Sequence, residues 1–329
     1  MSSTDKTQRV KKSKINFVAL LKKQGLLLAL ILIVIFFAVT TDKFFSYRNI
    51  SLILRQVSIL GVIACGMTFV IIAGNFDLSV GSLTSLTAVI AISLHDKIGP
   101  IPAILIALIA GLVFGSFSGF LVGYQKLNSL IITLGMLVAI QAITLIYTGG
   151  KYSRIAEPES TWFGFIGRGF VAGIPFPVII YAVFIAIFAV ILNKTVFGRQ
   201  VLAVGGNPTA SLFTGIRQSF VVLMTFVMTG VLTAVGGIML GSRMMAAQNY
   251  IGEGYELQVI TGVILGGTSL EGGEGSIIKT FIGILIIGVL KNGFIMLGLP
   301  YYFQWVVQWI IILAVVWIDV ATKRGKVLG

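Results

Sequence analysis

The residues that could carry out chemistry are few, and their spacing builds no reaction site. The chain has one histidine, His95, and one cysteine, Cys65, and it has no Cys/His cluster of metal-ligand spacing. The nearest approach to a phosphate-binding loop is Gly273–Thr280, GEGSIIKT, which ends in the lysine and threonine of that motif. Ile278 replaces the second glycine, and a β-branched side chain blocks the close backbone approach that cradles phosphate. We therefore expect no catalytic residue, metal site, cofactor or bound nucleotide in this chain, which does not read as an enzyme.

Composition instead describes a protein that crosses a membrane many times. Hydrophobic residues make up 57% of the 329 residues, charged residues 11%, and the mean hydropathy is +1.02, which excludes an ordinary soluble domain. A bilayer core needs roughly 20 apolar residues per helix, and fewer where a helix is broken. The sequence thus predicts an all-α fold with one transmembrane domain, 24–320, between a basic N-terminal segment, 1–23, and a tail, 321–329. Its ten predicted spans are 24–41, 57–73, 78–94, 101–124, 130–148, 176–192, 219–241, 256–269, 277–298 and 302–318.

The distribution of basic residues orients these spans. With the N-terminus inside, the inner segments hold fourteen Lys or Arg residues and the outer loops hold eight. The positive-inside rule therefore predicts that both termini are cytosolic. The same distribution accounts for the formal net charge of +13, because the excess Lys and Arg residues lie on the cytosolic side, next to anionic lipid headgroups. No basic surface for nucleic acid is needed to explain the charge, so we expect no nucleic-acid partner. Segment 193–218 then lies on the cytosolic side and loop 149–175 on the outer side.

The polar segment Phe197–Ile216, FGRQVLAVGGNPTASLFTGI, separates two long apolar runs. Asn207 can cap a helix there, Pro208 fits its first position, and Gly215 can end it in a left-handed conformation. This helix has about two turns, and isolated helices below roughly 12 residues are marginal in water. The segment therefore predicts a short cytosolic helix that docks on a partner protein. An interfacial helical turn without a partner is the alternative.

A second polar interruption, GNFD, lies between the second and third predicted spans. Asn75 or Asp77 can cap the helix that begins near Leu78, with Ser79 close by. Irregular backbone at membrane depth persists only where protein or water satisfies its polar groups. Capping is one explanation of these residues, and lining a gate at the cytosolic end of a solute pathway is the other.

Two lysines, Lys279 and Lys291, fall inside the ninth predicted span. Each costs roughly 2.5–3.5 kcal/mol at a helix centre on insertion scales, so both should face protein or water, or snorkel. Lys279 lies near the cytosolic end, where it can anchor the helix at the interface. Lys291 is deeper, and together with Asn292 it is a candidate to face the pathway.

The outer loop 149–175 mixes charges with Trp162 and Phe163, a composition suited to docking a soluble protein. An ordinary solvated loop is the alternative. The candidate docking residues are Lys151, Arg154, Glu157, Glu159 and Arg168, with Arg243 on the next outer loop.

Three segments carry a resemblance to a known family: Gly66–Ser82, GMTFVIIAGNFDLSVGS; Gly198–Ile216, GRQVLAVGGNPTASLFTGI; and Gly254–Ser276, GYELQVITGVILGGTSLEGGEGS. Together they resemble the membrane permease subunit of bacterial ABC importers of the ribose, galactose, arabinose and autoinducer type, over about residues 26–318. The resemblance implies import of a monosaccharide across the bacterial inner membrane by alternating access. It also implies three partners: a cytosolic ABC ATPase, a periplasmic or lipid-anchored sugar-binding protein, and a second permease subunit, identical or related.

The resemblance assigns an ATPase-coupling role to the segment 198–216. Positions that match the family's coupling loop are Gly198, Arg199, Ala203, Gly205, Gly206, Asn207, Ala210, Gly215 and Ile216. Pro208, Thr209 and Ser211 stand where the family usually has two acids and a second alanine, and Leu212 stands where it often has arginine. We therefore expect docking to rest on Leu212, Phe213 and backbone shape.

The competing class is an ion-coupled secondary transporter or channel that needs no ATPase. Its signature is a set of membrane-embedded acids or a His/Asp/Glu proton relay. Here no acid lies deeper than Asp77, Glu256 and Asp319, all near the ends of predicted spans. A membrane enzyme is disfavoured further, because no nucleophile, metal cluster or acid/base pair stands in one place.

Overall fold

The computed structural model describes residues 17–300, 302, 303, 305–307, 309, 310 and 313, and these residues are mostly helical. The helices are α1 (Phe17–Thr40), α2 (Tyr47–Ile72), α3 (Val80–Ile98), α4 (Pro100–Gly123), α5 (Ser129–Thr148), α6 (Phe163–Arg168), α7 (Phe176–Lys194), α8 (Val196–Gly206), α9 (Pro208–Phe213), α10 (Gln218–Met244), α11 (Tyr255–Leu265) and α12 (Ile277–Met296). Strand β1 (Ser153–Arg154) pairs antiparallel with β4 (Ala246–Ala247), and β2 (Phe170–Val171) with β3 (Ile174–Pro175). These four short strands were overlooked by the prediction of an all-α fold.

Six of the helices are long and apolar enough to cross a bilayer: α2, α4, α5, α7, α10 and α12. The first and eighth predicted spans correspond to shorter apolar helices, Gly25–Thr40 within α1 and the 11-residue α11. The third corresponds to α3, and the tenth, 302–318, lies largely outside the described residues. The prediction of ten spans is therefore confirmed for six, and the chain is a multi-pass membrane protein.

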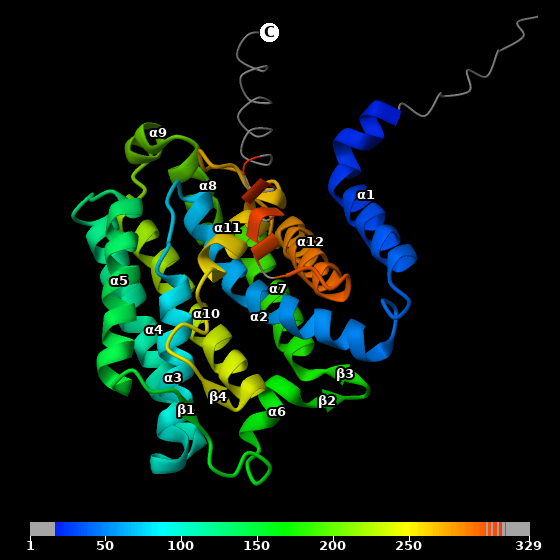
Figure 1. Ribbon diagram of the computed structural model, residues 1–329. Helices are drawn as coiled ribbons and strands as arrows, with labels where there is room; N and C mark the ends of the chain where they lie inside the picture. The colour runs from blue at the N-terminus through cyan, green and yellow to red at the C-terminus, as the bar shows by residue number, and fades with distance from the viewer. Residues whose placement is uncertain (1–16, 301, 304, 308, 311–312, 314–329) are drawn as a thin grey trace, which may run out of the picture.

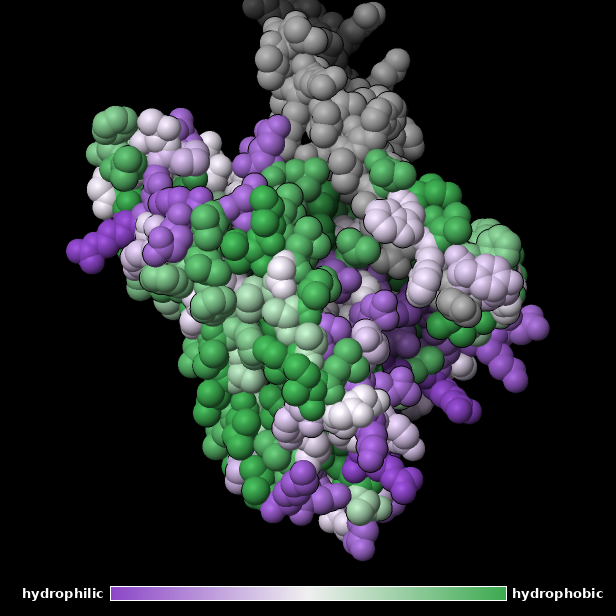
Figure 2. Space-filling view, turned by 60° about the vertical axis from the view of Figure 1, so that its left-hand side comes forward, coloured by the Kyte–Doolittle hydropathy of each residue, from purple (hydrophilic) through white to green (hydrophobic). Residues whose placement is uncertain are grey.

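Helices α2 and α10 form the centre of the molecule, and α4 and α5 lie outside them (Figure 1). The most apolar windows of α2 and α10 are 72% and 67% buried, against 28% for α4 and 22% each for α5 and α7. The outward faces of α4 and α5 are apolar, with Leu105, Ile109, Ile131 and Val138 more than half exposed. Figure 2 shows this surface as a broad hydrophobic area with hydrophilic residues above and below it. These side chains are thus suited to contact lipid.

Close backbone contact joins α4 to α10. Gly111, Gly115, Gly119 and Gly123 recur at every fourth position and so share one face of α4. A Cβ at Gly115 would lie 2.7 Å from the Phe226 carbonyl oxygen of α10. Small residues at this spacing let two helices approach until their backbones touch, which is a principal source of helix association in membranes.

The two ends of the molecule differ in their elements. Figure 1 shows α8, α9 and the beginning of α1 at one end, and α6 with all four strands at the other. The β1–β4 pairing ties loop 149–175 to the segment that follows α10. Segments 193–218 and 149–175, which the sequence analysis assigns to opposite sides of the membrane, therefore lie at opposite ends of the molecule.

Helix α2 begins ten residues before the predicted span at position 57, because a polar contact stabilises its first turns. Ser46 caps the helix by accepting a hydrogen bond from the Asn49 backbone N–H at 3.3 Å. The Asn49 side chain is buried against α12, where the two amides of Asn49 and Asn292 exchange hydrogen bonds of 3.1 and 2.8 Å. Hydropathy alone does not include such a turn in a span, because its residues are polar.

We expect Asn292→Leu to lower the thermal midpoint of the detergent-solubilised protein, since it leaves the buried Asn49 amide without this partner. An unsatisfied buried polar group costs about 1–3 kcal/mol. The double variant Asn49→Leu/Asn292→Leu should lose less than the sum of the two single variants, because the groups form one interaction. Size-exclusion chromatography after heating provides the measurement, and strictly additive losses would contradict the coupling.

Candidate functional site

The segment predicted as one short helix contains two, α8 and α9, which meet at Asn207. Helix α8 is capped by Thr195, whose Oγ1 accepts a hydrogen bond from the Gly198 N–H at 3.2 Å. Gly198 packs against the carbonyl groups of Ile191 and Leu192 near the end of α7. Because glycine has no side chain, the chain can bend sharply between α7 and α8. Only α9 was predicted, since the glycines of α8 favour a loop when judged by helix propensity alone.

The local structure of α9 confirms its predicted signals. Asn207 Oδ1 accepts from the Ala210 N–H at 2.9 Å, and Pro208 occupies the first helical position. At the other end Gly215 has φ +78°, its N–H donates to the Leu212 carbonyl, and the Ile216 N–H donates to the Ser211 carbonyl at 3.2 Å. This pair of bonds is the Schellman arrangement that stops a helix at a left-handed residue.

Gln218, which the sequence analysis did not single out, holds α9 to the start of α10. Its Nε2 donates to the Pro208 carbonyl and to Ser211 Oγ, the latter at 2.7 Å. Ser211 is consequently buried at 4% exposure, whereas Leu212 and Phe213 are 62% and 84% exposed. A helix fixed on one side thus presents two large apolar side chains to solvent on the other.

A groove of about 260 Å³ lies between α8 and α9, lined by Ala203, Gly206, Asn207, Ala210, Ser211 and Thr214. All six side chains are small or absent, so the groove can admit a larger side chain from a partner. Arg199 is exposed on α8 beside it. The predicted coupling residues are therefore divided among four places: the groove with Arg199 beside it, the exposed apolar tip at Leu212 and Phe213, the helix ends at Gly198, Gly215 and Ile216, and the interior contact of Gly205.

The end of α8 connects this groove to the interior of the molecule. Gly205 packs directly on the carbonyl oxygen of Ile72, the last residue of α2, and its Cβ position would lie 2.7 Å from the Gly273 nitrogen. The Gly273 N–H donates to that same Ile72 carbonyl at 2.8 Å. Residues from the three motifs singled out in the sequence, near 72, 205 and 273, therefore meet at one point. We call it the glycine junction (Ile72, Gly205, Gly206, Gly272 and Gly273).

The interruption 73–79 lies beside the glycine junction, and its polar groups are largely satisfied by the protein. Asp77 is 1% exposed, and its Oδ1 accepts from the Ser79 N–H at 2.9 Å and from Ser79 Oγ at 2.6 Å. Burial raises the pKa of the Asp77 carboxyl, and the two Ser79 hydrogen bonds oppose that rise. The predicted cap at Asp77 is therefore wrong: α3 begins at Val80, its N-cap is Ser79 without a side-chain capping hydrogen bond, and Asp77 instead stabilises the turn before it. Asn75 instead donates to the Ala73 carbonyl at 3.0 Å.

Lys291 and Asn292 differ in their surroundings. The Asn292 amide is bonded to Asn49, and its side chain is 1% exposed. Lys291 is half-buried in α12. A place on the pathway stays a prediction for Lys291, while the hydrogen bonds of Asn292 already account for its position.

At the opposite end, five of the six predicted docking residues are exposed: Lys151, Arg154, Glu157, Glu159 and Arg168. Arg168 is engaged, because its Nε donates to the Arg243 carbonyl at 2.7 Å and its guanidinium also reaches the Met244 carbonyl at 3.2 Å. A cation that bonds the last carbonyls of a helix acts as a C-terminal cap. Arg243 itself is half-buried. The exposed charges whose side chains make no hydrogen bond to the segment after α10 therefore lie on the first half of the loop.

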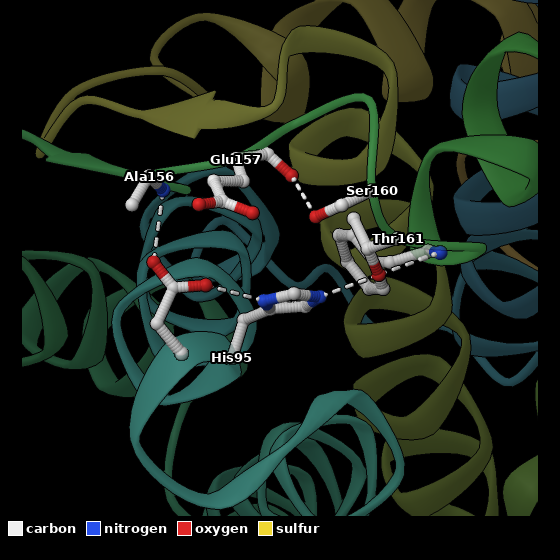
Figure 3. Close-up of polar contacts among 7 residues, drawn as sticks. His95, Ala156, Glu157, Ser160 and Thr161 are labelled. Carbon is white, nitrogen blue, oxygen red and sulfur yellow. Dashed lines mark hydrogen bonds and ion pairs between the residues drawn. The ribbon is translucent and has the colours of Figure 1, made fainter.

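A polar cluster at the end of α3 holds that half of the loop in place (Figure 3). His95 Nδ1 lies 2.7 Å from Asp96 Oδ1, and His95 Nε2 lies 2.8 Å from Thr161 Oγ1. The Ala156 N–H donates to Asp96 Oδ2 at 2.8 Å. The Ala156 hydrogen bond, with that to His95, lowers the pKa of the Asp96 carboxyl.

We expect Asp96→Asn to expose the outer loop to protease. Because the folded pKa is lowered, the carboxylate contributes stability above its unfolded-state pKa of about 4, and that contribution is lost as the pH falls through the lowered value. The amide removes the charge at neutral pH, so tryptic cleavage after Lys151 should accelerate several-fold. Glu159→Gln makes the same charge change on an exposed residue of this loop and should cleave at the wild-type rate. Equal cleavage of the two variants would contradict the role of Asp96.

Comparison with known proteins agrees with this architecture. The family model described as branched-chain amino acid transport system / permease component matches residues 49–316. The chain is 41% identical to the ribose import permease protein RbsC of Bacillus subtilis, covering 94% of this chain and 97% of that protein. It is 35% identical to RbsC of Escherichia coli, with 95% and 98% covered, and 35% identical to the xylose transport system permease protein XylH of Haemophilus influenzae, with 91% and 96% covered. No solved structure matches the chain.

The six candidate spans and the projecting α8–α9 pair define a multi-pass membrane protein of the transport-permease class. With a family model covering residues 49–316 and relatives similar along nearly their whole length, the chain belongs to the permease family of ABC importers, as its three motifs predicted.

Proposed function

We propose that this chain is the membrane-spanning permease subunit of an ATP-driven importer that carries a ribose-type monosaccharide across the bacterial inner membrane by alternating access. Both termini and the α8–α9 pair are cytosolic in this proposal, and loop 149–175 faces outward. The names of the relatives, which are ribose and xylose permeases, support a sugar as the solute. The partners are a cytosolic ABC ATPase, a periplasmic or lipid-anchored sugar-binding protein, and a second permease subunit.

The observation that carries this proposal is the α8–α9 pair with its link to the glycine junction. The Phe213 side chain is 84% exposed and can insert into a pocket of the ATPase. The adjoining groove can receive a side chain of the ATPase. The backbone contacts of Gly205 and Gly273 with Ile72 give displacement of α8 a direct route to α2 and to the loop before α12. A rigid contact between peptide groups transmits motion, because packed interiors deform little.

The outer end suits the binding protein. Lys151, Arg154, Glu157 and Glu159 are exposed on a loop that β1 and the Asp96 cluster hold in one position. Rim charges of both signs favour rapid, oriented encounter with a soluble partner. A preordered loop also reduces the entropy lost on docking.

Reconstitution into liposomes tests the proposal. Proteoliposomes that contain the permease and its ATPase should take up a radiolabelled pentose only when ATP is enclosed with the ATPase and the binding protein is outside. The competing function, an ion-coupled secondary transporter, predicts uptake driven by a proton or sodium gradient with no ATPase present. Uptake under that second condition would overturn the proposal.

A further inference from the structure

A cavity of about 360 Å³ opens at the beginning of α11, away from the coupling surface and the outer loop. Its wall includes Glu253, Glu256 and Gln258, at or just before the first turn of α11, together with Trp305 and Trp309. Volumes of this order enclose small organic ligands, and such sites combine apolar surface with a few convergent polar groups.

The cavity lies about halfway across the molecule. Helix α11 has 11 residues, so it spans about 16 Å, roughly half of a 30 Å hydrocarbon core. It is followed by residues that lead to the glycine junction, where Gly273 bonds to Ile72 at the α8 end. The beginning of α11 therefore lies near the midplane. Discontinuous helices that start at this depth are where transporters place their solutes.

One buried polar group at the cavity is unsatisfied. Gln258 is 7% exposed, and its Nε2 donates to the Gly254 carbonyl at 3.3 Å. Its Oε1 is buried and has no hydrogen-bond partner among the described residues. Buried polar atoms nearly always have partners, so an unpaired acceptor on a residue of the cavity wall calls for a donor from a ligand or water.

Two carboxylates add further acceptors beside this amide. Glu256 is fixed, because its Oε1 accepts from the Gly254 N–H at 3.2 Å and a Cβ on Gly81 of α3 would collide with its carboxylate. Glu253 is exposed at the cavity wall. Three acceptor side chains are matched by a ligand that is rich in hydroxyl donors and carries no negative charge.

Two tryptophans of the cavity wall supply apolar faces. Trp305 and Trp309 are four residues apart, 62% and 52% exposed, and both line the cavity. Indole rings offer flat apolar surface together with a polar edge. A sugar has the complementary pattern, with carbon-bound hydrogens on the faces of its ring and hydroxyls around its rim.

We propose that this cavity is a binding site inside the permease for a neutral monosaccharide in transit, with Gln258 and the two carboxylates accepting from its hydroxyls and the two indoles against its ring. The inference rests on the proposed sugar transport, and it adds that selectivity is exerted within the membrane chain itself. The described residues of the cavity wall include two carboxylates and no Lys or Arg. The site therefore rejects a phosphorylated sugar, because its negative charge is repelled and finds no cation.

Fluorescence of the purified permease tests binding directly. The variant Trp162→Phe/Trp317→Phe leaves Trp305 and Trp309 as the only two of the four tryptophans in the chain. Titration with D-ribose, D-xylose, L-arabinose and D-galactose should give a saturable change with at least one sugar, whereas D-ribose 5-phosphate should give none. In this background Gln258→Leu should raise the dissociation constant for that sugar about tenfold. A linear response to every sugar, or an equal response to the phosphate, would overturn the inference.

Transport separates this inference from the proposed function. In proteoliposomes with ATPase and binding protein, Gln258→Leu should slow uptake of the best sugar about tenfold while binding-protein-stimulated ATP hydrolysis persists. Gln248→Leu, on an exposed residue outside the cavity wall, should transport at the wild-type rate. If the wild-type protein fails to import any sugar with ATP, the proposed function fails. If it imports sugar and Gln258→Leu does so equally well, only the internal site is disproved.

Discussion

Gly205→Ala is expected to abolish ATP-driven transport, although it adds only one methyl group. The new Cβ would lie far inside contact distance of the Ile72 carbonyl oxygen and 2.7 Å from the Gly273 nitrogen. Overpacking costs roughly 1–3 kcal/mol where side chains can yield, and here the colliding atoms belong to backbone. Helix α8 must therefore move away from α2, and the hydrogen bond from Gly273 to Ile72 loses its geometry.

Gly206→Ala is the comparison variant, because it adds the same methyl group to the neighbouring glycine of the junction without a collision. Gly206 follows Gly205 as the last residue of α8, and its φ is not positive. A Cβ at Gly206 would lie 3.6 Å from the Gly273 Cα, which is an ordinary contact distance. Both variants should be compared for sugar uptake, for ATP hydrolysis stimulated by the binding protein, and for thermal midpoint in detergent. Equal activity of the two would show that the glycine junction does not transmit motion.

Ala210→Asp is expected to uncouple ATP hydrolysis from transport while leaving the permease folded. Ala210 lines the groove between α8 and α9 and is the third residue of α9, where an acid is compatible with a helix N-terminus. Exposed substitutions of this kind usually change stability by less than about 0.5 kcal/mol. A carboxylate trapped without a partner in an interface costs at least about 2 kcal/mol, which weakens docking roughly 30-fold.

Thr209→Asp adds the same charge one residue earlier, at an exposed position that does not line the groove. It also introduces an acid where acids are usual in the family's coupling loop. Co-purification of the ATPase and sugar uptake should both be lost with Ala210→Asp and retained with Thr209→Asp. Normal sugar uptake by the Ala210→Asp protein would remove the coupling role of this segment.

The predictions from sequence that the structure confirms rest on local signals. The ends of α9 were predicted because Asn207, Pro208 and Gly215 each act within a few residues of the chain: one caps, one presets φ, and one adopts the left-handed conformation that ends the helix. The resemblance then supplied the family, which the comparisons confirm.

Contacts between distant parts of the chain could not be predicted in this way. The Asn49–Asn292 pair joins residues 243 positions apart, and nothing near either residue indicates its partner. The glycine junction has no side-chain signature at Ile72, since only its carbonyl oxygen takes part. Gln218 resembles any surface glutamine until α9 is placed beside it.

Span boundaries failed for a related reason. Hydropathy includes apolar residues and omits the polar first turns of α2, which Ser46 and Asn292 stabilise. It also extended the eighth span to residue 269, whereas α11 ends at Leu265 and Gly267 adopts φ +83°. Hydropathy measures transfer to lipid, and helix ends depend on hydrogen bonding as well.

The glycine junction depends on backbone contacts, whereas the surface of α9 depends on its side chains, so the two can change independently during evolution. Its contacts are made by peptide groups that every amino acid shares, so the mechanical linkage is independent of the side chains displayed on α9. If α9 binds the ATPase as proposed, exchanging the exposed Thr209, Leu212 and Phe213 should change which ATPase is recognised without altering the contacts of the glycine junction. Grafting the outward side chains of α9 between related permeases should accordingly swap ATPase preference and leave the solute unchanged.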